Sequence, residues 1–236
     1  MVILKKLFMD RIDAANQLAD KLQRDLSELV GKDSNSKDVI VLAIPRGGVI
    51  IGDIIASRLG AGLDLVIVRK IRAPFNPELG IGAVMPDGIY FVDMNTVQAL
   101  GIPHEYIATE VSEQLREINR RIISYRGSSQ YDNLEGKVVI LVDDGIATGS
   151  TIYAAAQWVK RQRCKKLIIA VPIASKHALE MLRDVADKVV SVHSPESFEG
   201  VGQFYQDFSQ VPDEEVRAIM RKHSYKSNYG QSTMAE

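Results

Sequence analysis

Cysteine is almost absent from this sequence of 236 residues, in which Cys164 is the single example. One thiol cannot form an intrachain disulfide, and a chain without disulfides is typical of a reducing cytoplasm. No apolar run approaches the roughly 20 residues that a membrane-spanning helix needs. Neither sign of charge is in excess, since 29 basic residues face 30 acidic ones. We therefore expect a cytoplasmic protein that binds neither membrane nor nucleic acid.

The apolar residues follow two patterns along the chain. Short apolar runs rich in valine and isoleucine predict buried strands, and apolar residues at steps of three and four predict amphipathic helices. The predicted strands cover residues 39–44, 63–68, 89–92, 137–142, 167–171 and 188–192. The predicted helices cover residues 8–31, 49–59, 103–122, 152–159, 176–185 and 212–222. Alternation of the two indicates an α/β fold, in which a parallel sheet carries helices on both faces.

The same pass along the chain divides it into four parts. An N-terminal helix and loop cover residues 1–37, and the α/β core covers residues 38–192. Residues 193–223 form a small C-terminal lobe with a final helix, and the polar residues 224–236 are predicted to be disordered. Residues 72–82, which contain two prolines and two glycines, are predicted to be a long loop.

The segment 139–151 carries the clearest chemical pattern. Four apolar strand residues lead into Asp143 and Asp144, and a loop of small residues then opens a helix. Backbone N–H groups at a helix N-terminus bind phosphate, and Gly149 lets the backbone approach a ligand closely. Hydroxyl side chains follow at Thr148, Ser150 and Thr151. Carboxylates accept hydrogen bonds from vicinal hydroxyls and are ligands for Mg²⁺. Together these groups suit a ribose 5-phosphate.

Other interpretations of this segment explain less of it. A hairpin turn requires an alternating strand next, whereas residues 152–159 have helical spacing. Capping of a helix explains one acid at most and leaves the hydroxyl-rich loop unexplained. The chain contains neither the Gly-Lys-Ser/Thr of a Walker phosphate loop nor the dinucleotide glycine fingerprint.

Segment 139–151 resembles the motif with which type I phosphoribosyltransferases bind 5-phosphoribosyl pyrophosphate (PRPP). Four further segments look like a group of stand-alone phosphoribosyltransferases, and the likeness extends over residues 8–222. These segments are residues 43–48, 68–71, 76–83 and 201–208. The resemblance implies a type I core with a C-terminal hood. It also implies transfer of 5-phosphoribosyl from PRPP to a nitrogenous acceptor such as a nucleobase, with Mg²⁺ as cofactor and release of pyrophosphate. We also expect a homodimer.

The resemblance assigns roles to particular residues. Asp143 and Asp144 would be the catalytic acids, which hold the ribose hydroxyls and, through water and PRPP, the Mg²⁺ ion. The 5-phosphate would lie on Ala147, Thr148, Gly149, Ser150 and Thr151. Pyrophosphate would be held by Arg46, Gly47, Gly48, Arg69 and Lys70, and the loop of Arg46 often contains a non-proline cis peptide in this family. The alternatives are an ordinary tight turn for the glycines and a solvated pair for Arg69 and Lys70.

Acceptor binding is less defined by the sequence. Residues 72–82 would be a mobile loop that closes over the site, or a passive connector. Lys176 and the aromatic rings of Phe204 and Tyr205 would contact the acceptor; alternatively Lys176 is a surface residue and the rings pack a small lobe. Ala147 stands where family members that use 6-oxopurines carry a third acid, and the pattern here looks more like adenine phosphoribosyltransferases. The acceptor is therefore left open.

A protein that binds PRPP or a nucleotide as a regulator is the alternative to an enzyme. It would need a surface for nucleic acid, and the best candidates are Arg116, Arg120 and Arg121. Because Glu113 and Glu117 interleave with them, this face is typical of a solvated helix, and the enzyme is favoured.

Overall fold

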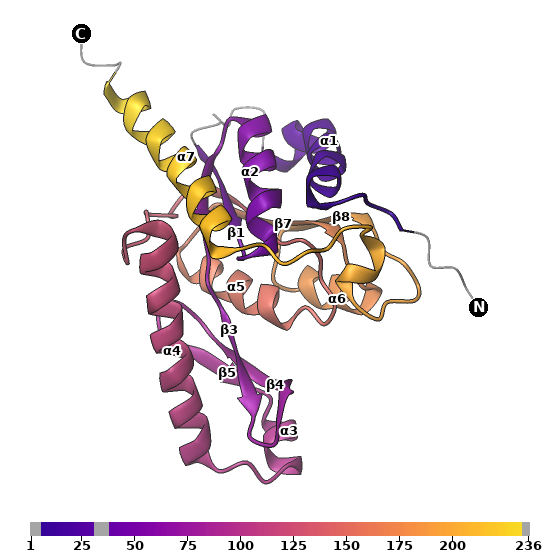
Figure 1. Cartoon of the computed structure of the whole chain (residues 1–236), viewed down its shortest axis with the longest axis vertical. Coiled ribbons are helices and arrows are strands. Elements are labelled where there is room, and N and C mark those ends of the chain that lie inside the picture. The colour runs from indigo at the N-terminus through magenta and orange to yellow at the C-terminus, as the bar shows by residue number, and fades with distance from the viewer. Residues whose placement is uncertain (1–5, 31–37, 233–236) are drawn as a thin grey trace.

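A five-stranded parallel sheet forms the centre of the protein (Figure 1). The structure is a computed structural model and describes residues 6–30 and 38–232. The strand order is β2-β1-β6-β7-β8. The strands are β1 (Val39–Ala43), β2 (Gly62–Leu65), β6 (Val138–Val142), β7 (Lys166–Ile173) and β8 (Lys188–His193). Every residue of β1 and β6 is buried, which explains why these strands are continuously apolar. The predicted parallel α/β core is confirmed.

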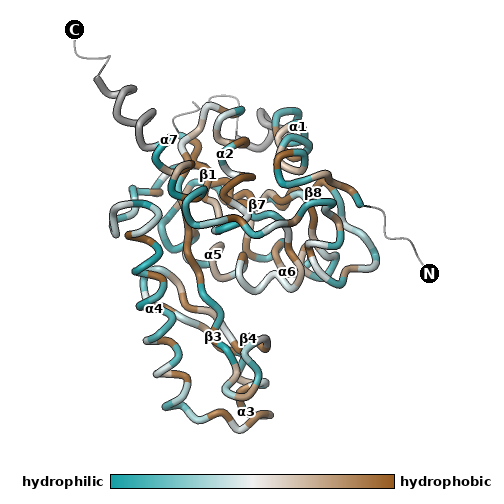
Figure 2. The backbone as a smooth tube through the Cα atoms, in the orientation of Figure 1, coloured by the Kyte–Doolittle hydropathy of each residue, from teal (hydrophilic) through white to brown (hydrophobic). Residues whose placement is uncertain are grey.

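Helices cover both faces of this sheet. Helices α1 (Arg11–Val30) and α2 (Gly47–Leu59) pack on one face, and α5 (Ser150–Arg161) and α6 (Lys176–Arg183) pack on the other (Figure 1). Each face has its own hydrophobic cluster, because successive strand residues point to opposite sides. Figure 2 accordingly shows hydrophobic residues along the strands in the middle of the molecule.

A second, antiparallel sheet extends away from the core together with two helices (Figure 1). Its strands, in spatial order, are β3 (Arg69–Ala73), β4 (Asn76–Val84) and β5 (Tyr90–Val92). The helices are α3 (Met94–Ala99), which the apolar pattern did not predict, and α4 (His104–Arg126). We call these five elements the arm.

The prediction that residues 72–82 form a loop is wrong, because they belong to the β3–β4 hairpin of the arm. Ile71 and Ala73 on β3 and Ile81 and Ala83 on β4 are buried at alternating positions. Prolines hide this pattern in the sequence. Pro77 is tolerated because it falls between the paired residues 76 and 80, where the ladder is irregular. The predicted strand at 63–68 likewise ends at Leu65, and Arg69 and Lys70 begin β3.

The C-terminal lobe, here called the hood as in the predicted division (residues 193–223), contains the short 3₁₀ helix η2 (Val201–Phe204) and the start of α7 (Asp213–Ser232). A bridge between Phe8 and Tyr205 ties the hood to the N-terminal segment. Helix α7 continues past its predicted end at residue 222, so the predicted disordered tail overlaps helical residues up to 232. The last four residues of that tail and residues 31–37, where the predicted N-terminal part ends, lie outside the described residues. No described helix is long and apolar enough to cross a membrane.

A buried ion pair fastens the arm to the core. Arg126, the last residue of α4, donates from Nε and Nη2 to the two carboxylate oxygens of Asp64 on β2, over 2.6 and 2.8 Å. The two side chains are 8% and 11% exposed. The guanidinium also lies 4.1 Å from the ring centre of Tyr131 and donates to the carbonyl of Ser128. Removal of one partner of this pair should therefore cost more stability than removal of one partner of a surface pair.

Replacement of Arg126 by Gln tests this conclusion. The free energy of unfolding in urea should fall by about 3–5 kcal/mol, because the charge of Asp64 would stay buried without a partner. Arg120→Gln on the same helix is the control: Arg120 is 60% exposed, and its loss should change little. Equally small effects for both variants would contradict a role for the pair in holding the arm.

Candidate functional site

Strand β6 places Asp143 and Asp144 at the carboxyl edge of the sheet. Both acids follow Val142 directly, at the middle of the five strands, where ligands bind in open α/β sheets. The side chain of Asp144 is only 14% exposed. The backbone N–H of Asp144 donates to Oδ1 of Asp143 over 2.8 Å. No side chain caps α5, so the alternative that an acid serves as its N-cap is wrong.

Gly47 and Gly48, which begin α2 directly after the turn that follows β1, pack against this acid pair, and we call residues 45–48 the glycine loop. β1 and β6 are hydrogen-bonded neighbours, which brings the two loops together. A Cβ atom on Gly47 would collide with the carboxylate of Asp144, and one on Gly48 would lie 2.9 Å from Cα of Asp143. Only glycine fits at either position without displacing the acids. The peptide bond between Pro45 and Arg46 is cis, as the family resemblance implies.

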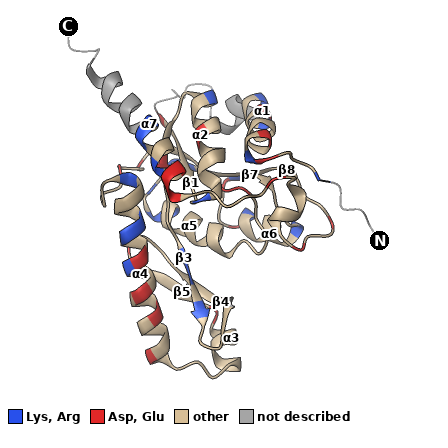
Figure 3. Cartoon of the chain, in the orientation of Figure 1, with Lys and Arg blue, Asp and Glu red and all other residues tan. Residues whose placement is uncertain are grey.

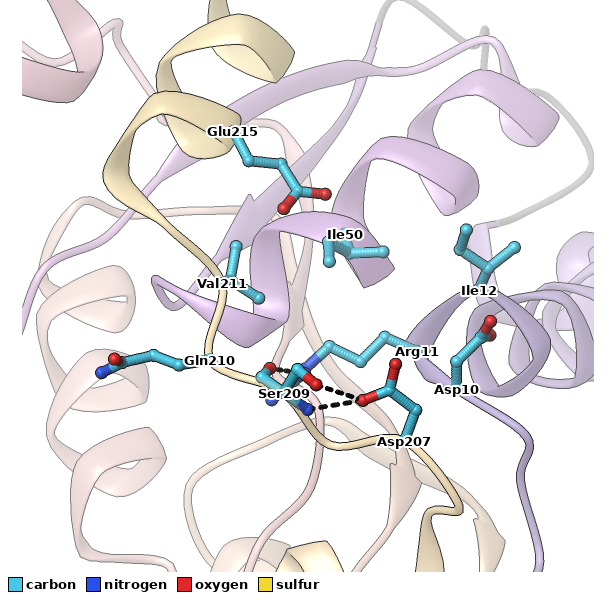
Figure 4. A pocket seen from close by; sticks show the side chains of 9 residues that line it. All are labelled: Asp10, Arg11, Ile12, Ile50, Asp207, Ser209, Gln210, Val211 and Glu215. Atoms are coloured by element: carbon cyan, nitrogen blue, oxygen red, sulfur yellow. Dashed lines mark hydrogen bonds between the residues drawn. The ribbon is translucent and has the colours of Figure 1, made fainter.

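Arg11 is a member of the site that the sequence did not reveal. From the start of α1, its Nε donates to Oδ2 of Asp144 over 2.8 Å, and its Nη1 donates to the carbonyl of Ser209 over 2.8 Å. Its guanidinium also stacks on the ring of Phe208, 4.0 Å from the centroid. Figure 4 shows Arg11 reaching Ser209 along one side of a pocket of about 170 Å³ between α1, α2 and the hood. No local sequence pattern predicts a contact between residues 133 positions apart.

The two acids are held at an electrostatic cost. Burial and the neighbouring charge of Asp144 raise the pKa of Asp143 well above its ordinary value. Burial also raises the pKa of Asp144, against the opposing effect of Arg11. The hydroxyl of Tyr205 donates to the carbonyl of Asp144 over 2.6 Å and so fixes the backbone between the acids and the hood. Perturbed acids at a sheet edge are characteristic of sites that bind a ligand.

The loop between β6 and α5 ends at Gly149, which has a φ of 84°. A Cβ atom on Gly149 would collide with Met181 of α6 and lie 3.3 Å from Cβ of Ala178. Glycine is therefore required by backbone conformation and by helix packing, in addition to any close approach of a ligand. The hydroxyl of Ser175 donates to the carbonyl of Ala147 over 2.6 Å and anchors the loop from the side of α6.

The first turn of α5 follows this loop with groups suited to an anion. The hydroxyl oxygens of Thr148 and Ser150 lie 3.4 Å apart. Thr151 is the second residue of the helix and is partly exposed. Unpaired N–H groups and hydroxyls at a helix N-terminus form a site for phosphate. All five residues that were predicted to bind phosphate therefore lie in the loop after β6 and the first turn of α5.

Two of the predicted basic residues, Arg46 and Arg69, are held by partners from other elements. Nη1 of Arg46 lies 3.3 Å from Oδ1 of Asp213, at the start of α7. Nε of Arg69 donates to Oε1 of Gln114 on α4 over 2.8 Å, and Lys70 is exposed. Burial, followed by the charge of nearby arginines, lowers the pKa of Arg69.

The predicted acceptor residues are occupied in other ways. Phe204 and Tyr205 are 2% and 1% exposed, and their rings pack against other aromatic rings. This geometry favours the alternative that they form the core of the hood. Lys176 forms an ion pair with Glu196 at the surface.

Carboxylate oxygens are the ligands that Mg²⁺ prefers, and Asp143 and Asp144 supply them. Among the described residues, no group of three or more histidine, cysteine, aspartate or glutamate side chains is placed to hold a metal ion. The acid pair therefore fits an ion whose other ligands are water and substrate oxygens, and does not by itself form a closed metal site.

Comparison with known proteins identifies the family of the chain. Residues 9–209 match the family model of the phosphoribosyl transferase domain. A Mycobacterium tuberculosis protein named "Putative phosphoribosyl transferase Rv0571c" is 38% identical over 215 residues, which cover 91% of this chain and 46% of that protein. This chain thus spans about half the length of that relative.

A solved structure shares the fold closely. The crystal structure of TT1426 from Thermus thermophilus superposes with a TM-score of 0.73 and 36% sequence identity. The superposition covers 91% of this chain and 98% of that one. With the family model matched over most of its length, the chain belongs to the phosphoribosyl transferase domain family.

Proposed function

We propose that this protein transfers the 5-phosphoribosyl group of PRPP to a nitrogenous acceptor, with release of pyrophosphate. The observation that carries the proposal is the contact between the acid pair and the glycine loop at the carboxyl edge of β1 and β6. Gly47 and Gly48 leave no space between that loop and Asp143 or Asp144. One ligand with a diol beside a pyrophosphate can therefore touch both loops at once, and PRPP has that arrangement.

Each part of PRPP has a counterpart in the site. The 5-phosphate would lie at the start of α5, on the backbone of residues 147–151. The ribose hydroxyls would donate to Asp143 and Asp144. The pyrophosphate would lie against the N–H groups of Gly47 and Gly48, where Arg46 adds positive charge.

Asp144 and Arg46 must change partners when PRPP binds. Asp144 is bound to Arg11, and Arg46 is bound to Asp213. Ribose hydroxyls and Mg²⁺ would take over the role of Arg11 at Asp144, while the pyrophosphate would compete with Asp213 for Arg46.

The chemistry requires charge stabilisation more than proton transfer. The bond between C1 of the ribose and the pyrophosphate oxygen breaks, and its electron pair leaves with pyrophosphate. The acceptor nitrogen then gives its lone pair to C1, and its proton passes to the departing pyrophosphate. Donors near the pyrophosphate and carboxylates below the sugar would stabilise the separated charges. Mg²⁺, held through water and PRPP at Asp143 and Asp144, would supply further neutralisation of the pyrophosphate.

The hood would shield this reaction from water, which otherwise captures the sugar cation. Its contacts with the site include the hydroxyl of Tyr205 on the carbonyl of Asp144, and Arg11 on Ser209 and Phe208. The acceptor would then enter beside the hood. No acid stands at Ala147, so the acceptor is expected to need no general base at that position.

A pyrophosphate-release assay with PRPP, Mg²⁺ and a panel of nucleobases tests the proposal directly. Release should depend on one class of base and be absent without base. The same protein should form the matching nucleoside 5′-monophosphate in equal amount. PRPP binding without turnover on any nitrogenous acceptor would contradict an enzyme and favour a regulator.

Replacement of the acids should separate function from folding. The double variant Asp143→Asn and Asp144→Asn should lose turnover, because the ribose and the ion lose their negative partners. The single variant Asp143→Asn should be more stable than the wild type at pH 7, because it removes a buried charge. Urea unfolding and the release assay, run on the same samples, measure the two effects.

The pH dependence of the stability difference between Asp143→Asn and the wild type is the control for the stability effect. A carboxyl group whose pKa is raised by folding destabilises the folded state at pH values above its unfolded pKa of about 3.9. The gain in stability of Asp143→Asn should therefore shrink as the pH falls toward about 4. If the double variant keeps turnover within a factor of about three of the wild type, roughly 0.7 kcal/mol, the two acids take no part in the reaction.

A further inference from the structure

One face of α4 connects the two predicted pyrophosphate arginines. Gln114 accepts a hydrogen bond from Arg69, and Tyr125 donates to Oδ1 of Asp213 over 2.8 Å. Asp213 in turn holds Arg46. Positions 114, 121 and 125 are separated by seven and four residues, and side chains at such steps lie on the same face of a helix. Arg121 therefore stands between the residue that holds Arg69 and the residue that leads to Arg46.

The charge of Arg121 acts on groups at both ends of this face. After burial, its charge is the largest cause that lowers the pKa of Arg69. It also contributes to the lowered pKa of Asp213, behind the hydrogen bond from Tyr125 and the contacts with Arg46. The helix geometry and these interactions agree that Arg121 lies between Gln114, which holds Arg69, and Tyr125, which binds the partner of Arg46.

Arg121 differs from its neighbour Arg120, although both bind Glu117. Nε of Arg121 donates to Glu117 over 2.6 Å, and its side chain is 25% exposed; the side chain of Arg120 is 60% exposed. The hydrogen bond from Arg120, opposed by burial and assisted by Arg121, lowers the pKa of Glu117 to about 2. Since Arg121 uses Nε for this bond, its two Nη atoms carry four further N–H donors.

Acidic side chains are interspersed among these arginines. Glu110 accepts from Gln114 and from the backbone of Arg72, while Glu117 and Asp213 are bound as described. Figure 3 shows basic residues on the C-terminal half of α4 and on β3, and acidic ones on the N-terminal half of α4 and at the start of α7. A pyrophosphate that displaces Asp213 from Arg46 would enter the basic part of this pattern.

We propose that Arg121 is a further pyrophosphate-binding residue, which forms with Arg46 and Arg69 a cluster of three arginines around the leaving group of PRPP. The proposal rests on the proposed function and extends its site from the core to α4 of the arm. Guanidinium groups suit this role, because their planar donors bind phosphate oxygens in pairs. Ligands that lack the pyrophosphate should not depend on Arg121.

The test compares Arg121→Gln with the matched control Arg120→Gln. Each variant loses one arginine that binds Glu117, but the side chain of Arg120 is 60% exposed, whereas that of Arg121 is 25% exposed. Dissociation constants are measured with Mg²⁺ for PRPP, for inorganic pyrophosphate and for ribose 5-phosphate. In Arg121→Gln, the constants for PRPP and pyrophosphate should rise about tenfold or more, since a charge-assisted hydrogen bond is lost. The constant for ribose 5-phosphate should stay within a factor of about two, and Arg120→Gln should resemble the wild type.

Other outcomes overturn the inference in distinguishable ways. Unchanged pyrophosphate affinity in Arg121→Gln, with normal binding by the wild type, refutes the role of Arg121 and leaves the proposed function standing. Equal losses for all three ligands, together with a lower melting temperature, assign Arg121 to folding only. If the wild type binds neither PRPP nor pyrophosphate, the proposed function itself fails. Arg121→Lys, which keeps the charge but not the planar donors, should give intermediate constants and provides a milder variant for the same comparison.

Discussion

The burial of two adjacent carboxylates at the end of β6 is the constraint around which the site is organised. Two like charges in a buried position are unfavourable, and burial raises the pKa of both Asp143 and Asp144. Arg11 offsets part of this cost through a 2.8 Å ion pair. Because Arg11 also binds Ser209 and stacks on Phe208, the same side chain fixes the N-terminal segment to the hood. Arg11 therefore both offsets the charge of the acids and holds the hood in place.

The glycine loop and the hood depend on the same acids. Gly47 and Gly48 must lack side chains because the carboxylates occupy that space, and Tyr205 is oriented by the carbonyl of Asp144. A Cβ atom on Gly145 would lie 2.5 Å from Val201, so the hood also rests on the loop that follows the acids. A ligand that alters the charge at Asp144 would therefore act on the loop and the hood together. This coupling suits a reaction whose intermediate must be protected from water.

The sequence predicted the parts of the site that are local and missed those that join distant segments. The apolar run of β6, its acids and the hydroxyl-rich helix start are contiguous, and each is recognisable from spacing alone. The contacts Arg11–Asp144 and Arg46–Asp213 join residues 133 and 167 positions apart, and no periodicity encodes such pairs. The β3–β4 hairpin was missed because prolines and glycines obscure the alternation of Ile71, Ala73, Ile81 and Ala83. Phe204 and Tyr205 were aromatic candidates for the acceptor, yet the apolar surface of a small lobe has to be buried, and their rings serve that purpose.

The central claim, that the carboxyl edge of β1 and β6 binds PRPP, is tested most directly by the melting temperature of the wild-type protein. A ligand that binds only the folded state stabilises it by mass action. Millimolar PRPP with Mg²⁺ should raise the melting temperature, and ribose 5-phosphate with Mg²⁺ should raise it less, because it lacks the contacts of the pyrophosphate. No shift with PRPP, while nucleoside 5′-monophosphates are also without effect, would contradict the account.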